Sequence, residues 1–326
     1  MTDSLGLVAG VAIGAVAALF SSVAVAAPVG AARCVACHAE IAREWEASGH
    51  RRSGTDPAYV TAVAKEPLPF CRGCHVPSGD ASQPTPVAIA ERGVGCTDCH
   101  VDVDAGHGAS GRTAAPPARG CAACHEFRFA ASPGLMQRTA TEHAASAFAS
   151  TACASCHMPS SGTRPHRDHR FQVDDAMLAR ALVADVTPAG ATRVALRIRS
   201  GAVGHAMPTG DIFRRLEVRV VATGGAGEVL GSATRFLSRK FRSERTAAGT
   251  FTKSDARDDR VGAGLEPCFE LDVGARGAGR PLSVTIQYQR VQEPRRGGEG
   301  DAVLNGTSLV WSAIVRPDQE PSKPCR

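Results

Sequence analysis

Alternation of hydrophobic and polar residues dominates the second half of the chain. Hydrophobic residues recur at every second position in four stretches, 194–198, 216–220, 269–273 and 282–288. Residues 309–315 form a fifth and more apolar stretch. Period-two alternation is typical of strands that bury one face. Because turns rich in Gly and Pro separate the stretches, we predict an all-β antiparallel sandwich of about seven strands over residues 178–326.

The first half of the chain shows neither this alternation nor long helical periods. Residues 32–177 are rich in Gly, Pro, Ala and Ser, and residues 41–50 form a short amphipathic stretch. Such a composition interrupts helices and strands after a few residues. We therefore predict a separate, loop-rich domain with short helices and little regular structure over residues 32–177.

The N-terminus carries an uncharged apolar run from Leu5 to Ala27. A small-residue cleavage site at residues 24–26 favours an export signal over residues 1–26. The usual basic residues before the run are missing, since only Asp3 is charged there. An uncleaved membrane anchor is the alternative, because the run approaches the length of roughly 20 residues that spans a membrane. Either way, we expect the rest of the chain to be periplasmic or extracellular.

Ten of the twelve cysteines fall into five copies of the pattern Cys-x-x-Cys-His. This pattern is the attachment signature of c-type haem, in which both thiols form thioethers and the histidine is the proximal iron ligand. The predicted cofactor is therefore haem c, in five copies. The predicted haem-binding residues are Cys34, Cys37, His38, Cys71, Cys74, His75, Cys96, Cys99, His100, Cys121, Cys124, His125, Cys153, Cys156 and His157.

Two other uses of paired cysteines fit the pattern poorly. Structural zinc sites use two Cys-x-x-Cys pairs for each metal ion and need no histidine after each pair. A thiol-redox motif occurs once, beside a βαβ unit, and not five times in a loop-rich stretch. The five motifs lie within about 140 residues, so the haems themselves are expected to form the core of this domain. Close packing of this kind is what stepwise electron transfer requires.

Six histidines remain as candidates for the second axial ligand of each iron. We predict that His50, His107, His169 and His205 are ligands, while His143 and His166 compete for the last position and His143 is preferred. The alternative for the last two is a solvated surface histidine. Four methionines could replace histidine as axial ligands, but side-chain packing is the preferred interpretation: Met136, Met158, Met177 and Met207.

Several of these motifs resemble one known family. The residues are Trp45, Ser48 and His50, then Gly93-Val94-Gly95-Cys96, Met136-Gln137-Arg138-Thr139, His157-Met158-Pro159, His169-Arg170-Phe171 and the loop His205–Gly210. In order and content they resemble the multihaem cytochromes of the cytochrome c five-fifty-four type. The resemblance implies electron carriage by stacked pairs of bis-histidine haems, with His50, His169 and His205 as distal ligands. It gives no ligand role to His143, because family members tend to have Trp there.

Two cysteines lie outside the motifs. Outside the cytoplasm, a Cys268–Cys325 disulfide that holds the C-terminal tail is the favoured interpretation. Two free thiols or an intermolecular pair are the alternatives.

The formal charge gives little information about partners. It is +5, but the propionates of five haems would bring it to about −5. No long Lys- or Arg-rich block suggests nucleic acid, and the short basic run of Arg239, Lys240, Arg242 and Arg245 is interpreted as a solvated face. A membrane partner is expected only if the N-terminal segment stays uncleaved.

The favoured function is electron transfer between a donor and an acceptor redox protein, with self-assembly as a further option. The alternative is an oxidoreductase that acts on a small nitrogen or sulfur oxyanion at one open haem. Every motif ends in His and none in Lys, which argues against the enzyme. Neither Tyr59 nor Tyr288 lies near a motif in a way that suggests a haem crosslink.

Overall fold

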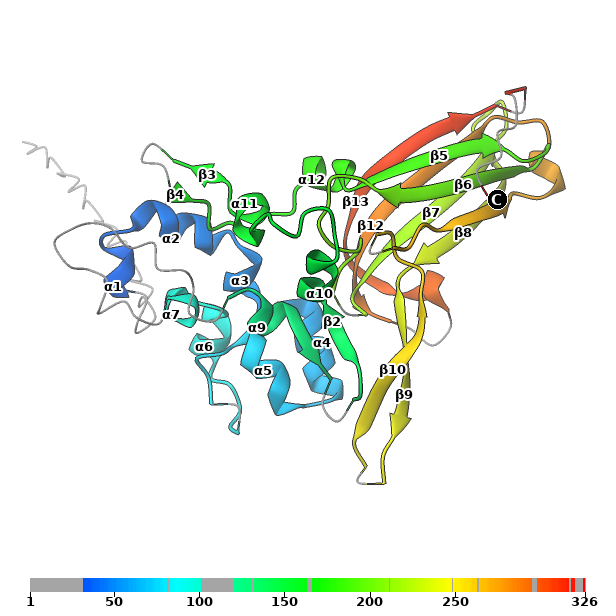
Figure 1. Ribbon diagram of the computed structural model, residues 1–326. Coiled ribbons are helices and arrows are strands. Elements are labelled where there is room, and N and C mark those ends of the chain that lie inside the picture. The colour runs from blue at the N-terminus through cyan, green and yellow to red at the C-terminus, as the bar shows by residue number, and fades with distance from the viewer. Residues whose placement is uncertain are drawn as a thin grey trace, which may run out of the picture.

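The computed structural model describes residues 32–80, 82–100, 120–129, 132–162, 166–210, 212–247, 249–262, 264–294, 298–316, 318–319 and 325. Figure 1 shows short helices gathered in the first part of the chain and long strands in the second. The predicted export signal over residues 1–26 lies outside the described residues, as does His107. Among the described residues, no helix is long and apolar enough to cross a membrane.

The first part is built from helices of four to nine residues and two small hairpins. The helices are α1 (Ala32–Val35), α2 (Ala39–Glu46), α3 (Gly49–Arg52), α4 (Pro57–Lys65), α5 (Pro69–His75), α6 (Val87–Arg92), α7 (Cys96–Cys99), α9 (Ala122–His125), α10 (Thr139–Ala144) and α11 (Cys153–His157). The hairpins are β1 (Glu126–Arg128) with β2 (Leu135–Arg138), and β3 (Ser160–Ser161) with β4 (His166–Arg167). The prediction of short helices with little other regular structure is confirmed.

Side-chain caps and prolines set where several of these helices begin. Ser48 precedes α3 and accepts a hydrogen bond from the backbone N–H of Arg51. Asp56 caps α4 in the same way, and Pro57 occupies the first position of that helix. Both arrangements satisfy N–H groups that a helix leaves without a partner at its start. Local sequence therefore explains these helices, although they are too short to be stable alone.

The second part begins after α12 (Asp175–Arg180) and consists of two antiparallel sheets and a long hairpin. One sheet has the order β11 (Cys268–Asp272), β6 (Arg193–Ser200), β5 (Leu182–Pro188). The other has the order β13 (Val303–Val315), β12 (Leu282–Glu293), β7 (Arg214–Thr223), β8 (Val229–Leu237). Two short 3-10 helices, Ala275–Gly277 and Glu299–Asp301, lie in the connections. All five hydrophobic stretches that predicted strands are found in these sheets.

One hydrophobic core joins the two sheets. Leu196 and Ile198 of the first sheet and Val218, Val284 and Ile286 of the second are fully buried in the same cluster. Each such side chain contributes roughly 1.5–3 kcal/mol when it leaves water. The hydrophobic residues that alternate in the sequence are thus the residues that are buried in this core.

The hairpin of β9 (Arg239–Arg245) and β10 (Phe251–Asp258) extends away from both sheets in Figure 1. The interpretation of this basic run as a solvated face is wrong for Arg239, which is buried. Its guanidinium donates to the backbone oxygens of Leu135 and Met136 and to Asp255. The base of the hairpin therefore contacts the helical part of the chain.

Cys268 and Cys325 form the favoured disulfide, with 5.4 Å between their Cα atoms. The bond fixes Cys325 to the first residue of β11, 57 residues earlier in the chain. The prediction of an intramolecular pair is confirmed.

Candidate haem-binding sites

Each Cys-x-x-Cys-His motif forms one helical turn. The backbone N–H of the histidine donates to the carbonyl of the first cysteine, as for His100 on Cys96 at 2.8 Å and His125 on Cys121 at 2.9 Å. Residues three and four apart in a helix lie on the same face. Both thiols and the imidazole therefore share one face, which is the arrangement that thioether attachment and proximal ligation need. The ten motif cysteines form no disulfide.

Cysteines of different motifs lie next to one another. The pKa of the Cys74 thiol is raised above its ordinary value, chiefly by a hydrogen bond with Cys124 and by burial. Burial raises the pKa of Cys96, which also contacts Cys34, and that of Cys121, which contacts Cys153. The first motif thus lies beside the third, the second beside the fourth, and the fourth beside the fifth.

A further contact joins these pairs into one group. The pKa of Cys99 is raised by burial and by Asp98, and then by Cys124 and Cys121 of the fourth motif. The third motif therefore lies close to the fourth. All five motifs are connected through neighbouring thiols, in an order that differs from their order in the sequence.

Three motif histidines face a second histidine. The ring centroids of His125 and His50 are 6.2 Å apart, those of His100 and His169 are 6.3 Å apart, and those of His157 and His205 are 6.2 Å apart. Metal–imidazole bonds are about 2 Å long, so an iron between two imidazoles separates their centroids by roughly 6 Å. The angle between the rings is free, because each imidazole can rotate about its bond to the metal. All three pairs therefore fit haem iron.

Hydrogen bonds to backbone carbonyls indicate which nitrogen of three of these imidazoles can bind iron. Nδ1 of His169 lies 2.6 Å from the carbonyl oxygen of Arg167, and Nδ1 of His205 lies 3.0 Å from that of Ala206. Nδ1 of His75 similarly lies 3.0 Å from the carbonyl of Ser53. An N–H donated from Nδ1 leaves Nε2 as the ligand nitrogen and orients the ring.

Burial favours the neutral form, which is the form that binds metal, in five of the candidate ligand histidines. The pKa of His50 is lowered to about 4, first by burial and then by the nearby His125 and His169. Burial also lowers the pKa values of His125, His157, His169 and His205. No proton therefore has to be removed from these rings near neutral pH before they can bind iron.

The family-like motifs that contain Trp45, His50 and Val94 contact one another. Trp45 donates its indole N–H to the carbonyl of Val94 at 2.8 Å, and the N–H of Val94 donates to the carbonyl of His50 at 2.9 Å. Gly93 lies so close to α3 that an added Cβ would meet the His50 carbonyl oxygen at 2.3 Å. Residues that are far apart in the sequence thus hold the helix that carries His50.

A partly buried carboxylate holds the loop of His169. Glu44 Oε2 accepts the backbone N–H of His169 at 2.9 Å and lies 3.0 Å from Nε2 of His166. His166 therefore uses the nitrogen that an axial ligand would need, which favours the other candidate. His143 packs beside the His205 loop, where a Cβ added at Gly204 would meet its Cδ2 at 2.9 Å.

The remaining predicted residues are placed as follows. Met136 and Met207 are buried, and Met207 belongs to the hydrophobic core, in agreement with a packing role. Tyr59 stacks on the ring of His75, with centroids 4.2 Å apart, so its place beside a motif was missed. Glu44 was also missed, because a single glutamate in an amphipathic helix carries no signal in the sequence.

Comparisons with known proteins concern the family and the fold of the chain. Residues 33–101 match the family model described as cytochrome c554 and c-prime. The fold is similar to the crystal structure of a penta-heme cytochrome c552 from Thermochromatium tepidum, with a TM-score of 0.63 and 21% identity over 86% of this chain and 98% of that chain. At this identity the structural match concerns the fold alone. A search of curated proteins found no significant match.

Proposed function

We propose, on the premise that this chain is a multihaem c-type cytochrome of the cytochrome c554 type, that it is an exported electron-transfer protein with five covalently bound haems. The proposed domains are a pentahaem domain over residues 32–177 and a β-sandwich domain over residues 178–326. The observation that carries the proposal is the set of three opposed histidine pairs, each at the separation that an iron between two imidazoles requires.

The protein residues have simple roles in this function. Haem c, when bound, supplies an iron that gains and loses one electron. Each of the three opposed histidine pairs would hold one haem iron with two imidazoles, and a haem held in this way would carry an electron and would have no position for a substrate. The hydrogen bonds that Nδ1 of His169 and of His205 donates to backbone carbonyls would hold these two rings in place.

The contacts between motifs favour an electron path that does not follow the sequence. The first motif lies beside the third, the third beside the fourth, and the fourth beside the fifth. The second motif adjoins the fourth and would form a side branch. The first, second and fifth haems are at the ends of this branched order, so electrons would enter or leave there.

Two distal ligands complete the proposal. His107 and His143 remain the proposed further distal ligands. The contact of His166 Nε2 with Glu44 supports the choice of His143 over His166.

The disulfide supports export, because such bonds persist in oxidising compartments. The proposed partners are a donor and an acceptor redox protein, and contact with further copies of the chain is a further option.

Electron paramagnetic resonance of the oxidised protein tests this function. We expect low-spin ferric signals from bis-histidine haems and no change on addition of nitrite. A substantial high-spin signal that shifts with nitrite or cyanide would contradict the carrier function and favour an oxidoreductase. His143→Ala and His166→Ala form a matched pair, since only the first is expected to convert one haem to high spin.

A further inference from the structure

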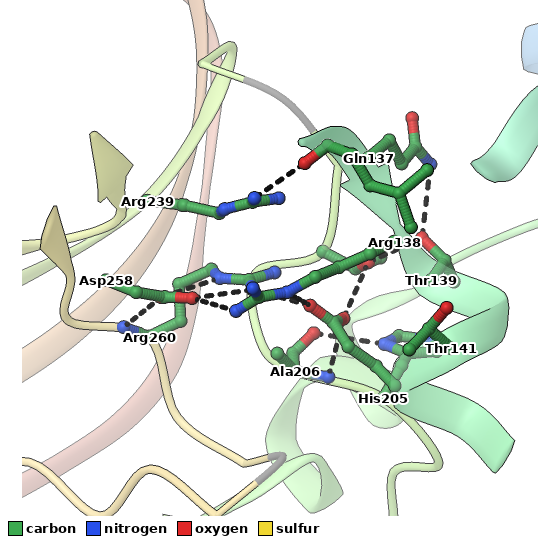
Figure 2. Close-up of polar contacts among 12 residues, drawn as sticks. Gln137, Arg138, Thr139, Thr141, His205, Ala206, Arg239, Asp258 and Arg260 are labelled. Carbon is green, nitrogen blue, oxygen red and sulfur yellow. Dashed lines mark hydrogen bonds and ion pairs between the residues drawn. The ribbon is translucent and has the colours of Figure 1, made fainter. Parts of the chain in front are cut away.

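A buried cluster of charges joins the helical part to the β part beside His205. Glu142 of α10 and Arg260, which follows β10, are both almost fully buried. Their side chains meet at 2.5 Å, and Arg260 also binds Asp258 at 2.9 Å. Arg138 contacts the same two carboxylates, at 3.2 Å from Glu142 and 2.6 Å from Asp258. Two guanidinium groups thus balance two carboxylates. Figure 2 shows Arg138, Asp258 and Arg260 of this cluster beside His205.

The second oxygen of Glu142 reaches the loop that carries His205. Oε2 accepts the backbone N–H of Ala206 at 3.2 Å and lies 3.4 Å from the hydroxyl of Thr209. The carbonyl of Ala206 in turn accepts the Nδ1–H of His205 at 3.0 Å. Glu142 is therefore two hydrogen bonds away from the imidazole that faces His157.

The other side of this loop is fixed to the β part. Met207 and Val261 exchange two backbone hydrogen bonds, of 2.7 and 2.9 Å, and Arg260 donates to the carbonyl of Pro208 at 3.3 Å. Because Arg260 also binds Glu142, the same side chain contacts the loop and the carboxylate that holds it. The loop is thus held between α10 and the segment after β10.

We propose that Glu142 is a positioning residue for His205 and sets the orientation of that ring toward His157. This inference rests on the proposed ligation of iron by these two histidines. Their rings are nearly parallel, with an angle of 11° between the planes. A carboxylate buried to this degree is stable only when it is paired and hydrogen-bonded, so its position is defined by Arg260 and Ala206 together. The β part thereby supplies and holds a ligand for a haem attached in the helical part.

Two variants of Glu142 test separately whether the length of its side chain or its negative charge positions His205. Glu142→Gln keeps the side-chain length and an oxygen that can accept the Ala206 N–H, but it removes the charge and places an NH2 group, which cannot accept a hydrogen bond, toward Arg260 and Arg138. Glu142→Asp keeps the charge but is one methylene shorter, so it cannot reach Arg260 and Ala206 at once. If Glu142 positions His205, the low-spin spectrum of the Gln variant should be closer to that of the wild type than the spectrum of the Asp variant is. The Asp variant should show high-spin iron in up to one haem of the five.

The measurement is electron paramagnetic resonance of the full-length, haem-loaded protein, with haem content checked by intact mass. Glu270→Ala is the control, because Glu270 pairs with Arg193 on the exposed surface. It should leave the spectrum unchanged. An Asp variant whose spectrum is as native as that of the Gln variant, or more so, would overturn the positioning role.

A further variant keeps the two proposals distinguishable. His205→Ala should convert one haem to high spin, and added imidazole should restore its low-spin signal. If His205→Ala has no effect, the proposed ligation itself fails. If His205→Ala has this effect but the Asp variant retains the wild-type spectrum, only the positioning role of Glu142 fails.

Discussion

Replacement of Gly93 by alanine tests how the distal ligand His50 is held. Gly93 ends α6 with φ of 59° and ψ of −133°, a backbone conformation that residues with a side chain rarely adopt. An added Cβ would lie 2.3 Å from the His50 carbonyl oxygen and 2.7 Å from that of Arg51. Both oxygens belong to the backbone of α3, so the clash can be relieved only if α3 and the segment of Gly93 move apart.

The expected loss of stability combines two effects. The unfavourable backbone conformation costs about 1–3 kcal/mol. A shift of α3 also weakens the hydrogen bond from the Val94 N–H to the His50 carbonyl, which contributes about 1 kcal/mol. We therefore expect Gly93→Ala to lower the free energy of unfolding by about 2–4 kcal/mol. We also expect the haem bound by His125 to lose part of its low-spin character.

Gly49→Ala is the matched control. Gly49 precedes His50 in the same helix, but an added Cβ there would meet nothing within 4 Å. Urea unfolding followed by circular dichroism gives the stability, and electron paramagnetic resonance gives the spin state. If Gly93→Ala unfolds at the same urea concentration as Gly49→Ala and has the same low-spin spectrum, the contact between Gly93 and α3 does not hold His50.

Three further predictions concern the ligand set, the charge cluster and the disulfide. His50→Ala should convert one of the five haems to high spin and imidazole should reverse the change; an unaltered spectrum would exclude His50 as a ligand. Burial acts to raise the pKa of Asp258, but Arg260 outweighs it and holds that pKa below 3.8. The interaction of ionised Asp258 with Arg260 therefore stabilises the fold above about pH 3.8, the ordinary pKa of this carboxyl. This stabilisation is lost as the pH falls through the lower pKa that Asp258 has in the folded state. The urea midpoint should therefore drop less between pH 6 and pH 3 in Asp258→Asn than in wild type; equal drops would refute the assignment. Cys268→Ser together with Cys325→Ser should remove about 4 kcal/mol, since the bond closes a loop of 57 residues, and a midpoint unchanged from wild type would show that the bond does not stabilise the fold.

The sequence predicts those parts of the structure whose signal is local. The alternation of Leu196 and Ile198 indicates a strand because burial on one face has a period of two. The five haem motifs are recognisable because thioether attachment needs two thiols and an imidazole on one helical turn. His50, His169 and His205 were proposed as ligands from motifs, and each now faces a proximal histidine.

Other features depend on contacts between distant residues and left no local signal. Glu142 and Arg260 are 118 positions apart, and neither stands in a recognisable motif. The burial of Arg239 likewise depends on carbonyl groups more than a hundred residues earlier in the chain. The partner of each proximal histidine could not be predicted either, because the pairing follows the packing of the motifs in space.

The intact mass of the purified, exported protein tests the central claim most directly. We expect one species that carries five haem masses on its ten motif cysteines and retains the Cys268–Cys325 bond. A protein with markedly fewer haems, or with zinc bound by these cysteines, would contradict the claim that all five motifs attach haem.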